Sequence, residues 1–245
     1  ENVTKIYGTE TVAVRDASFD IPKSQFVFLV GPSGSGKSTL LRLINRQEQP
    51  ERGDVWVAGQ NINELPASRV PHLRRSMGNV FQDYKLLLNK TVFENVAFAL
   101  EVIGKPRHVI DRQVPIVLDL VGLADKQDRF PNQLSGGERQ RIAIARALVS
   151  EPEVLVCDEV TSALDVLVQA AIVDLLSDLR RQLGLAMLFV THNLPLVRSI
   201  ADEVAVMSEG RIVEVGPSES VIGNPQQQYT QSLISATPSI ERSMR

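Results

Sequence analysis

The chain has 245 residues, of which 43% are hydrophobic and 22% are charged, as is ordinary for a globular protein with a sizeable core. Its 26 basic and 29 acidic side chains give a net charge of −3, which argues against binding to nucleic acid through bulk positive charge. The single cysteine, Cys157, excludes an internal disulfide and favours a reducing compartment.

No apolar run approaches the roughly 20 residues that a membrane-spanning helix requires, and no signal peptide is recognisable. We therefore expect that any contact with a membrane is made through a partner. The chain begins at Glu1 without a methionine, in what looks like the middle of a strand, so we expect a short N-terminal piece to precede it.

The residues from 1 to about 30 alternate short apolar runs with turns, which predicts strands. Thr11–Val14 and Ala17–Ile21 are two of these runs. A buried strand over Phe26–Val30 is followed by a predicted helix over residues 39–44. Another strand lies between the glycines of the segment 53–59.

A second character begins near Arg69, where the pattern becomes mostly helical up to Pro131. Beyond it, strands that read as buried on both faces alternate with helices, which predicts a parallel α/β core with a helical insertion. The helices expected in the insertion are Val92–Ile103 and Val109–Val121. The later strands are Val154–Cys157, Ala186–Val190 and Val204–Met207, with helices over Val166–Gln182 and Leu194–Ala201 between them.

The segment from Gly31 to Ser38 reads GPSGSGKS and matches the phosphate-loop pattern G-x-x-x-x-G-K-[ST] between a strand and a helix. Glycines allow the backbone to wrap around phosphate oxygens, so that N–H groups and the positive end of the helix face the anion. Lys37 would supply a positive charge for the terminal phosphates, and the Ser38 hydroxyl could coordinate Mg²⁺. The alternative, a glycine-rich turn without a ligand, is disfavoured by the complete pattern. The predicted nucleotide-binding residues of this segment are Gly31, Ser33, Gly34, Ser35, Gly36, Lys37, Ser38 and Thr39.

Two acids, Asp158 and Glu159, end the apolar strand that begins at Val154. The carboxyl edge of a parallel sheet is where open α/β folds bind their ligands. Asp158 is predicted to hold Mg²⁺ directly or through water, and Glu159 to polarise the water that attacks the γ-phosphate. Taken alone, the pair could equally be two solvated acids at a strand end, but the phosphate loop favours the catalytic interpretation.

The run Leu134–Arg141 reads LSGGERQR and precedes a predicted helix over Ile142–Val149. It resembles the signature of ATP-binding-cassette (ABC) ATPases, and the resemblance covers essentially the whole chain because further family motifs occur in the expected order. The resemblance implies an α/β fold with a P-loop NTPase core and parallel sheet, an antiparallel β subdomain and a helical insertion. We expect one such domain, with residues 1–81 and 132–223 as core and β subdomain, 82–131 as the helical subdomain and 224–245 as a polar tail.

The resemblance also implies roles for residues outside the phosphate loop. Tyr7 matches the aromatic residue that stacks on adenine. Gln82 matches a catalytic and Mg²⁺-contacting glutamine in the loop that enters the helical subdomain. The segment 162–165 matches a dimer-contacting loop, and His192 matches a histidine that senses the γ-phosphate.

The signature itself, Ser135 with Gly136 and Gly137, caps a helix whose N-terminus can grip an anion. The resemblance implies that this grip acts in trans, on ATP held by a second subunit. Two nucleotides would then lie between two chains, in a homodimer or in a heterodimer with a similar cassette. The ligands expected are therefore ATP and Mg²⁺, and no nucleic acid.

Short segments of the chain resemble three different groups of ABC ATPases, which bear on the identity of the membrane partner. The segments Val80–Leu87 and Thr91–Lys105 look like the cell-division ATPase family FtsE, which works with the membrane protein FtsX. The segments 157–166 and 224–233 look like oligopeptide, dipeptide or nickel importer ATPases. Arg42–Arg46 and residues 122–126 are similar to methionine importer ATPases, so the chain reads as a mosaic, natural or engineered by a joint near residue 150.

In ABC proteins the membrane subunit docks near the glutamine loop and the helical subdomain, so residues 82–130 are expected to choose the partner. Their likeness to FtsE favours an FtsX-like partner, with a peptide, nickel or methionine importer permease as the alternative. A soluble ABC protein of the translation or repair type is disfavoured, because the chain holds one cassette and a short insertion. We expect a peripheral protein at the cytoplasmic face of the bacterial inner membrane.

Overall fold

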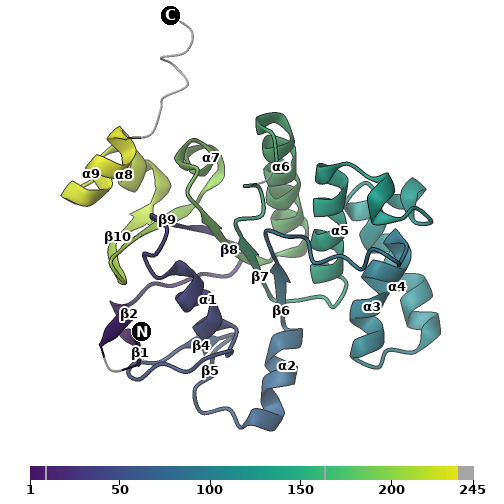
Figure 1. Cartoon of the computed structure of the whole chain (residues 1–245), viewed down its shortest axis with the longest axis horizontal. Coiled ribbons are helices and arrows are strands. Elements are labelled where there is room, and N and C mark those ends of the chain that lie inside the picture. The colour runs from purple at the N-terminus through teal and green to yellow at the C-terminus, as the bar shows by residue number, and fades with distance from the viewer. Residues whose placement is uncertain (9, 163, 237–245) are drawn as a thin grey trace, which may run out of the picture. The chain divides into compact units, whose positions relative to one another are not determined.

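The computed structural model of the chain describes residues 1–8, 10–162 and 164–236 (Figure 1). These residues form two compact units, the first built from residues 1–74 and the chain from Leu188 onward, the second from Arg75–Met187. Both units combine helices with strands: β3 pairs with β9 and β6 with β7 in parallel, whereas β10 is antiparallel to β9. The predicted α/β class is confirmed. The expected helical subdomain, residues 82–131, does not coincide with either of these two units and stays a prediction.

The antiparallel part of the first unit consists of two small sheets. β1 (Val3–Tyr7) pairs with β2 (Thr11–Ala17), and β4 (Trp56–Val57) pairs with β5 (Gln60–Asn61). The two strands expected between residues 11 and 21 are one strand that ends at Ala17. Irregular register with β1 accommodates this longer strand, and a bridge between Thr4 and Arg52 ties β1 to the segment before β4.

The parallel part of the first unit carries the phosphate loop. Its strands lie in the order β10, β9, β3 and β8, with β3 parallel to β9 and β10 antiparallel to it. α1 begins directly after the loop that follows β3, and α8 and α9 pack beside β10 (Figure 1). The bounds are β3 (Phe26–Val30), α1 (Lys37–Ile44), η1 (Ala67–Arg69), α2 (Val70–Arg75), β8 (Ala186–Thr191), α7 (Leu194–Ile200), β9 (Glu203–Ser208), β10 (Arg211–Pro217), α8 (Ser218–Gly223) and α9 (Gln228–Ser235).

Three phenylalanines form the centre of this unit's core. Phe26, Phe28 and Phe189 are fully buried, with ring centroids 4.7 Å apart for Phe26 and Phe28 and 4.9 Å apart for Phe28 and Phe189. Stacked and tilted aromatic pairs at this spacing stabilise a core beyond their buried area. The strand that leads into the phosphate loop is therefore anchored in the core by its first and third residues.

In the second unit, β6 (Met77–Val80) runs parallel to β7 (Val154–Asp158), and helices pack around them. α5 contacts α3, α4, α6 and β6 (Figure 1). The helices are α3 (Val92–Val102), α4 (Arg107–Leu120), η2 (Ala124–Lys126), η3 (Pro131–Gln133), α5 (Gly136–Leu148) and α6 (Val166–Leu183).

The structure contains two elements that the sequence did not predict, the strand β6 and the helix α9. β6 is a strand although its short sequence MGNV contains a glycine and an asparagine, and pairing with β7 explains it. The expected polar tail contains a helix, α9. Just before this helix, the backbone N–H groups of Gln226 and Gln227 donate hydrogen bonds to the Glu214 carboxylate. The part of the tail after Ala236 lies outside the described residues. Among the described residues, no helix has the length and apolar character needed to cross a membrane.

Candidate nucleotide-binding site

The phosphate loop of the first unit passes so close to other backbone that two of its glycines leave no room for a side chain. A Cβ atom at Gly31 would lie 2.2 Å from the carbonyl oxygen of Met207, and one at Gly36 would lie 2.4 Å from that of Ala13. Gly36 also has φ of 107°, in the region that favours glycine. The neighbouring backbone therefore requires glycine at both positions, independently of any ligand.

The side chain of Lys37 lies inside the loop. Only 7% of the residue is exposed, and its Nζ donates to the carbonyl oxygens of Gly31 at 2.8 Å and Pro32 at 2.7 Å. The buried Ser35 supports the loop from the other side, because its carbonyl oxygen accepts the Gly210 N–H at 2.9 Å. By contrast, Ser33, Gly34 and Ser38 are exposed. A positive charge is thus enclosed by a loop whose outer rim is open to a ligand.

Tyr7, predicted to stack on adenine, ends β1 in the same unit. The Lys5 Nζ lies 5.5 Å from the centroid of its ring, and the ammonium also donates to Glu51 at 2.9 Å. The Tyr7 hydroxyl is buried beside the Arg42 guanidinium of α1 and raises the pKa of that group. Tyr7 therefore lies beside the helix that follows the phosphate loop, with Lys5 over its ring.

His192 follows β8 directly and is exposed. The next residue, Asn193, caps α7, and its own N–H is accepted by the Thr191 hydroxyl at 3.0 Å. The histidine therefore lies between a buried strand and a capped helix, in a short segment with little backbone freedom. This is the position that the sequence predicted for it.

In the second unit, Gln82 and the acidic pair lie at the same edge of the paired strands. Val80 of β6 is in register with Cys157 of β7, and the strands are parallel, so Gln82 and Asp158–Glu159 both follow at the carboxyl ends. Gln82 is exposed, and Asp158 and Glu159 are half-buried. Cys157 is fully buried, and burial next to Asp158 raises the pKa of its thiol, so it is a packing residue.

Glu159 has a backbone conformation that the sequence did not reveal. Its φ is 49°, the left-handed region that a residue with a Cβ rarely adopts. The amide and the hydroxyl of Ser162 both donate to the Glu159 carbonyl oxygen, at 3.1 Å and 2.9 Å. Strain of this kind concentrates at functional sites, where it fixes the direction of a side chain.

The signature forms the start of α5. Ser135 is the N-cap, its hydroxyl accepting the Glu138 N–H at 3.3 Å while the Glu138 carboxylate accepts the Ser135 N–H at 2.8 Å. Lys126 forms an ion pair with the same carboxylate, and together these groups lower the pKa of Glu138 to about 2. The expected cap at Ser135 is confirmed, but α5 begins at Gly136, six residues before the predicted start of the helix at Ile142.

The two signature glycines are needed for close packing. A Cβ atom at Gly137 would lie 2.7 Å from Cγ1 of Val168, and one at Gly136 would lie 3.2 Å from Cδ2 of Leu164. Both contacts are made by the segment that leads from the acidic pair into α6. Of the predicted dimer-contacting loop 162–165, Ala163 lies outside the described residues.

The residues predicted to hold Mg²⁺ offer only oxygen donors. Ser38 has a hydroxyl, Gln82 an amide and Asp158 a carboxylate, which is the donor set that Mg²⁺ takes together with phosphate oxygens. In the described part of the chain, no three histidine, cysteine, aspartate or glutamate residues are grouped so that they could hold a metal ion. Each of the three side chains thus carries an oxygen of the kind that Mg²⁺ accepts.

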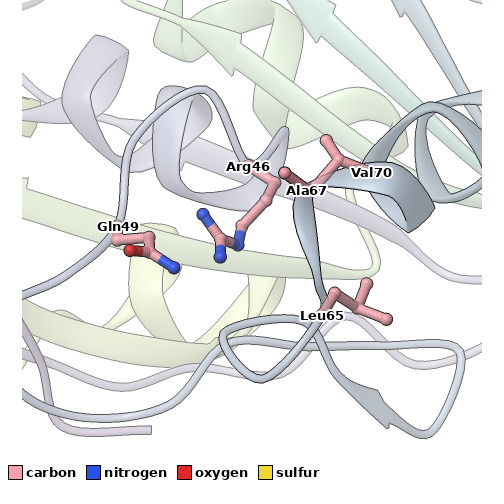
Figure 2. A pocket seen from close by; sticks show the side chains of 5 residues that line it. All are labelled: Arg46, Gln49, Leu65, Ala67 and Val70. Carbon is pink, nitrogen blue, oxygen red and sulfur yellow. The ribbon is translucent and has the colours of Figure 1, made fainter.

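A cavity of about 550 Å³ lies in the first unit, beyond the end of α1, and Figure 2 shows the side chains that line it. It is lined by Arg46, Gln49, Leu65, Ala67 and Val70, and by no residue of the phosphate loop. The Arg46 guanidinium donates to the carbonyl oxygens of Ile62 and Asn63, at 2.9 Å and 3.3 Å. Its hydrogen bonds thus hold the neighbouring backbone, and none of the five lining residues belongs to the phosphate loop.

Comparisons with known proteins agree over almost the whole chain. A family profile described as "ABC transporter" matches residues 14–162. The chain is 47% identical over 236 residues to the methionine import ATP-binding protein MetN of Thermobifida fusca, covering 96% of this chain and 74% of that protein. It is 45% identical to MetN 1 of Salmonella typhimurium, covering 96% and 70%. Among solved structures, cbiO1 of Clostridium perfringens, part of the ABC transporter complex cbiONQ, matches with a TM-score of 0.87 and 29% identity over 100% of this chain and 96% of that one.

Proposed function

The chain belongs to the ABC transporter family of ATP-binding subunits, which are ATPases, and we propose that it is the ATP-hydrolysing subunit of a methionine importer. One observation carries the substrate class: identity of 47% to a methionine import protein extends over 96% of the chain. That match spans both the part that looks like FtsE and the part that looks like peptide importers. A chimera is therefore not needed to explain the mixed local likenesses.

The proposed chemistry divides between the two units. In the first, the enclosed ammonium of Lys37 and the glycine-rich backbone bind the phosphates, and Tyr7 stacks on adenine. In the second, Glu159 accepts a proton from the attacking water, and its left-handed backbone fixes where the carboxylate lies. Gln82, in the same unit, orients the water, and His192, which belongs to the first unit, contacts the γ-phosphate. A Mg²⁺ ion held by Ser38, Asp158 and Gln82 would neutralise phosphate charge.

The signature is proposed to act on the ATP of a second subunit. Ser135 and the first amides of α5 present the positive end of a thirteen-residue helix to an anion. A homodimer or a heterodimer with a similar cassette would then complete each site. In this arrangement, ATP binds at the interface and stabilises the dimer.

The membrane partner is proposed to be the transmembrane subunit of a methionine importer, with the chain at the cytoplasmic face of the membrane. The expectation of a cell-division role and an FtsX-like partner is not supported, because the relatives that are 44–47% identical over 96% of the chain include methionine import proteins. Local likeness in residues 80–105 was a misleading guide, since a short segment carries less information than identity over the whole chain. The soluble ABC class has no support from these relatives either.

Co-expression tests this assignment directly. The chain would be produced with the transmembrane subunit of a methionine importer and, separately, with FtsX, and each complex purified from membranes in detergent. We expect a stable complex only with the importer subunit, and uptake of labelled methionine that requires ATP in vesicles containing it. Glu159→Gln is the matched control, because it should keep the complex and abolish uptake. A stable complex with FtsX alone would overturn the proposal.

A further inference from the structure

The loop after β6, which carries Gln82, contains two consecutive residues in an unfavourable backbone conformation. Tyr84 has φ of 50° and Lys85 has φ of 47°, and neither is glycine. Left-handed conformations are costly for residues with a Cβ, and two in succession need support from their surroundings. The source of that support indicates what controls the loop.

Arg146 supplies it. This residue lies on α5, the helix that begins at the signature, and its two terminal nitrogens donate to the carbonyl oxygens of Lys85 at 2.5 Å and Tyr84 at 2.6 Å. A guanidinium that bridges two successive carbonyls fixes the peptide unit between them, which a lysine ammonium could not do with the same geometry. Burial lowers the pKa of Arg146 and the nearby Asp83 carboxylate opposes that shift, so the group is half-enclosed by the loop that it holds.

Hydrogen bonds to a second helix fasten the downstream half of the same loop. The fully buried Asn95 of α3 donates to the carbonyl oxygens of Leu87, Lys90 and Thr91 at 2.9–3.0 Å, and its own carbonyl accepts the Leu87 N–H. The Tyr84 hydroxyl oxygen lies 3.4 Å from the place that a Cβ on Gly136 would occupy. The upstream half of the loop is thus attached to α5 and the downstream half to α3.

We propose that Arg146 is a positioning residue that couples the Gln82 loop to the signature helix, by holding Tyr84 and Lys85 in the left-handed conformation. A displacement of the loop then displaces α5. Conversely, Gln82 takes the position that hydrolysis requires only while α5 stays in place. The effect on turnover rests on the proposed role of Gln82, whereas the effect on loop conformation does not. Both are measurable.

The test uses strain relief as a rescue. In Arg146→Met, we expect kcat for ATP hydrolysis to fall about tenfold, because the free energy that disfavours one left-handed residue corresponds to a change in rate of about that factor. KM for ATP should change less than about twofold, because the phosphate loop lies in the other unit. Adding Lys85→Gly, which tolerates positive φ, should restore several-fold of the loss. Adding Lys85→Ala removes the same side chain and its contact with Phe81, but keeps the conformational cost, and should restore nothing.

Hydrogen exchange of the amides from Gln82 to Asn89 gives a readout that does not require activity. Arg146→Met should increase exchange there and Lys85→Gly should partly reverse it, with the unfolding temperature of each variant showing that the chain is folded. An inactive wild-type protein whose exchange follows this pattern would refute the proposed function but support the coupling. An active wild type with unchanged exchange in Arg146→Met, or equal rescue by glycine and alanine, would overturn the coupling.

Discussion

At the scale of single residues, binding and hydrolysis of ATP should be separable, since the structure places Lys37 and Glu159 in different units. Lys37→Ala removes the ammonium enclosed by the loop and should abolish detectable binding of ATP. Glu159→Gln keeps the shape of the side chain but removes the proton acceptor. It should bind ATP normally and lower kcat by about two orders of magnitude or more. Equilibrium binding of a fluorescent ATP analogue and steady-state hydrolysis check both, and normal turnover by Glu159→Gln would remove it from the base role.

Glu138 predicts a particular dependence of stability on pH. Lys126 and the groups of Ser135 lower the pKa of Glu138 from 4.5 to about 2, so the ionised form is favoured in the folded chain. A carboxyl group of this kind stabilises the fold above pH 4.5, and its contribution is lost as the pH falls toward 2. Glu138→Gln should therefore lower the free energy of unfolding at pH 7 by on the order of 1 kcal/mol, allowing for solvent screening.

The measurement is urea unfolding of both proteins between pH 7 and pH 3. The difference between them should shrink steadily below pH 4.5. Lys126→Met provides the matched comparison, because it removes the partner and leaves the carboxylate in place. A difference that does not depend on pH would mean that Glu138 acts through its shape alone.

At the scale of elements, the start of α5 and the start of α6 fit together so closely that Gly137 cannot be enlarged without a shift. Gly137→Ala should be destabilising by about 1–3 kcal/mol, since overpacking of a tight contact costs that much. Val168→Ala removes the methyl group that the new Cβ would meet at 2.7 Å, so the double variant should recover most of the loss.

Gly223→Ala is the control for this experiment, because a Cβ there would meet nothing within 4 Å. It should leave stability unchanged or raise it slightly, as alanine is the better helix former. Thermal unfolding monitored by circular dichroism distinguishes the variants. Equal destabilisation of the Gly137 single and double variants would show that the contact with Val168 is not the cause.

At the scale of the whole molecule, ATP should control association. Val166 and Leu167 at the start of α6 are 76% and 83% exposed, next to the loop 162–165 that is predicted to contact a second subunit. Glu159→Gln, which should retain ATP, is expected to change from monomer to dimer on sizing chromatography when Mg-ATP is added. Leu167→Asp should weaken that dimer at least tenfold, because burying an unpaired carboxylate is unfavourable. A Glu159→Gln protein that stays monomeric in saturating ATP would contradict the signature acting in trans.

The sequence alone was sufficient for features that depend on neighbouring residues. The phosphate loop, the Ser135–Glu138 cap of α5 and the acidic end of β7 all follow from patterns a few residues long, because turns and helix caps form through local hydrogen bonds and steric preferences. The α/β class and the ABC family followed from the order of such segments. Parts without a strong local pattern, such as β6 and α9, were missed.

Tertiary structure decided what depends on residues distant in the chain. Gly36 must be glycine because Ala13 lies against it, and the Gln82 loop keeps its shape because Arg146, 61 residues beyond Lys85, holds its carbonyls. The left-handed backbone of Glu159 is also invisible in a pattern of residue types. Such contacts form only when folding brings separate segments within a few ångströms, and no local preference of either segment specifies them.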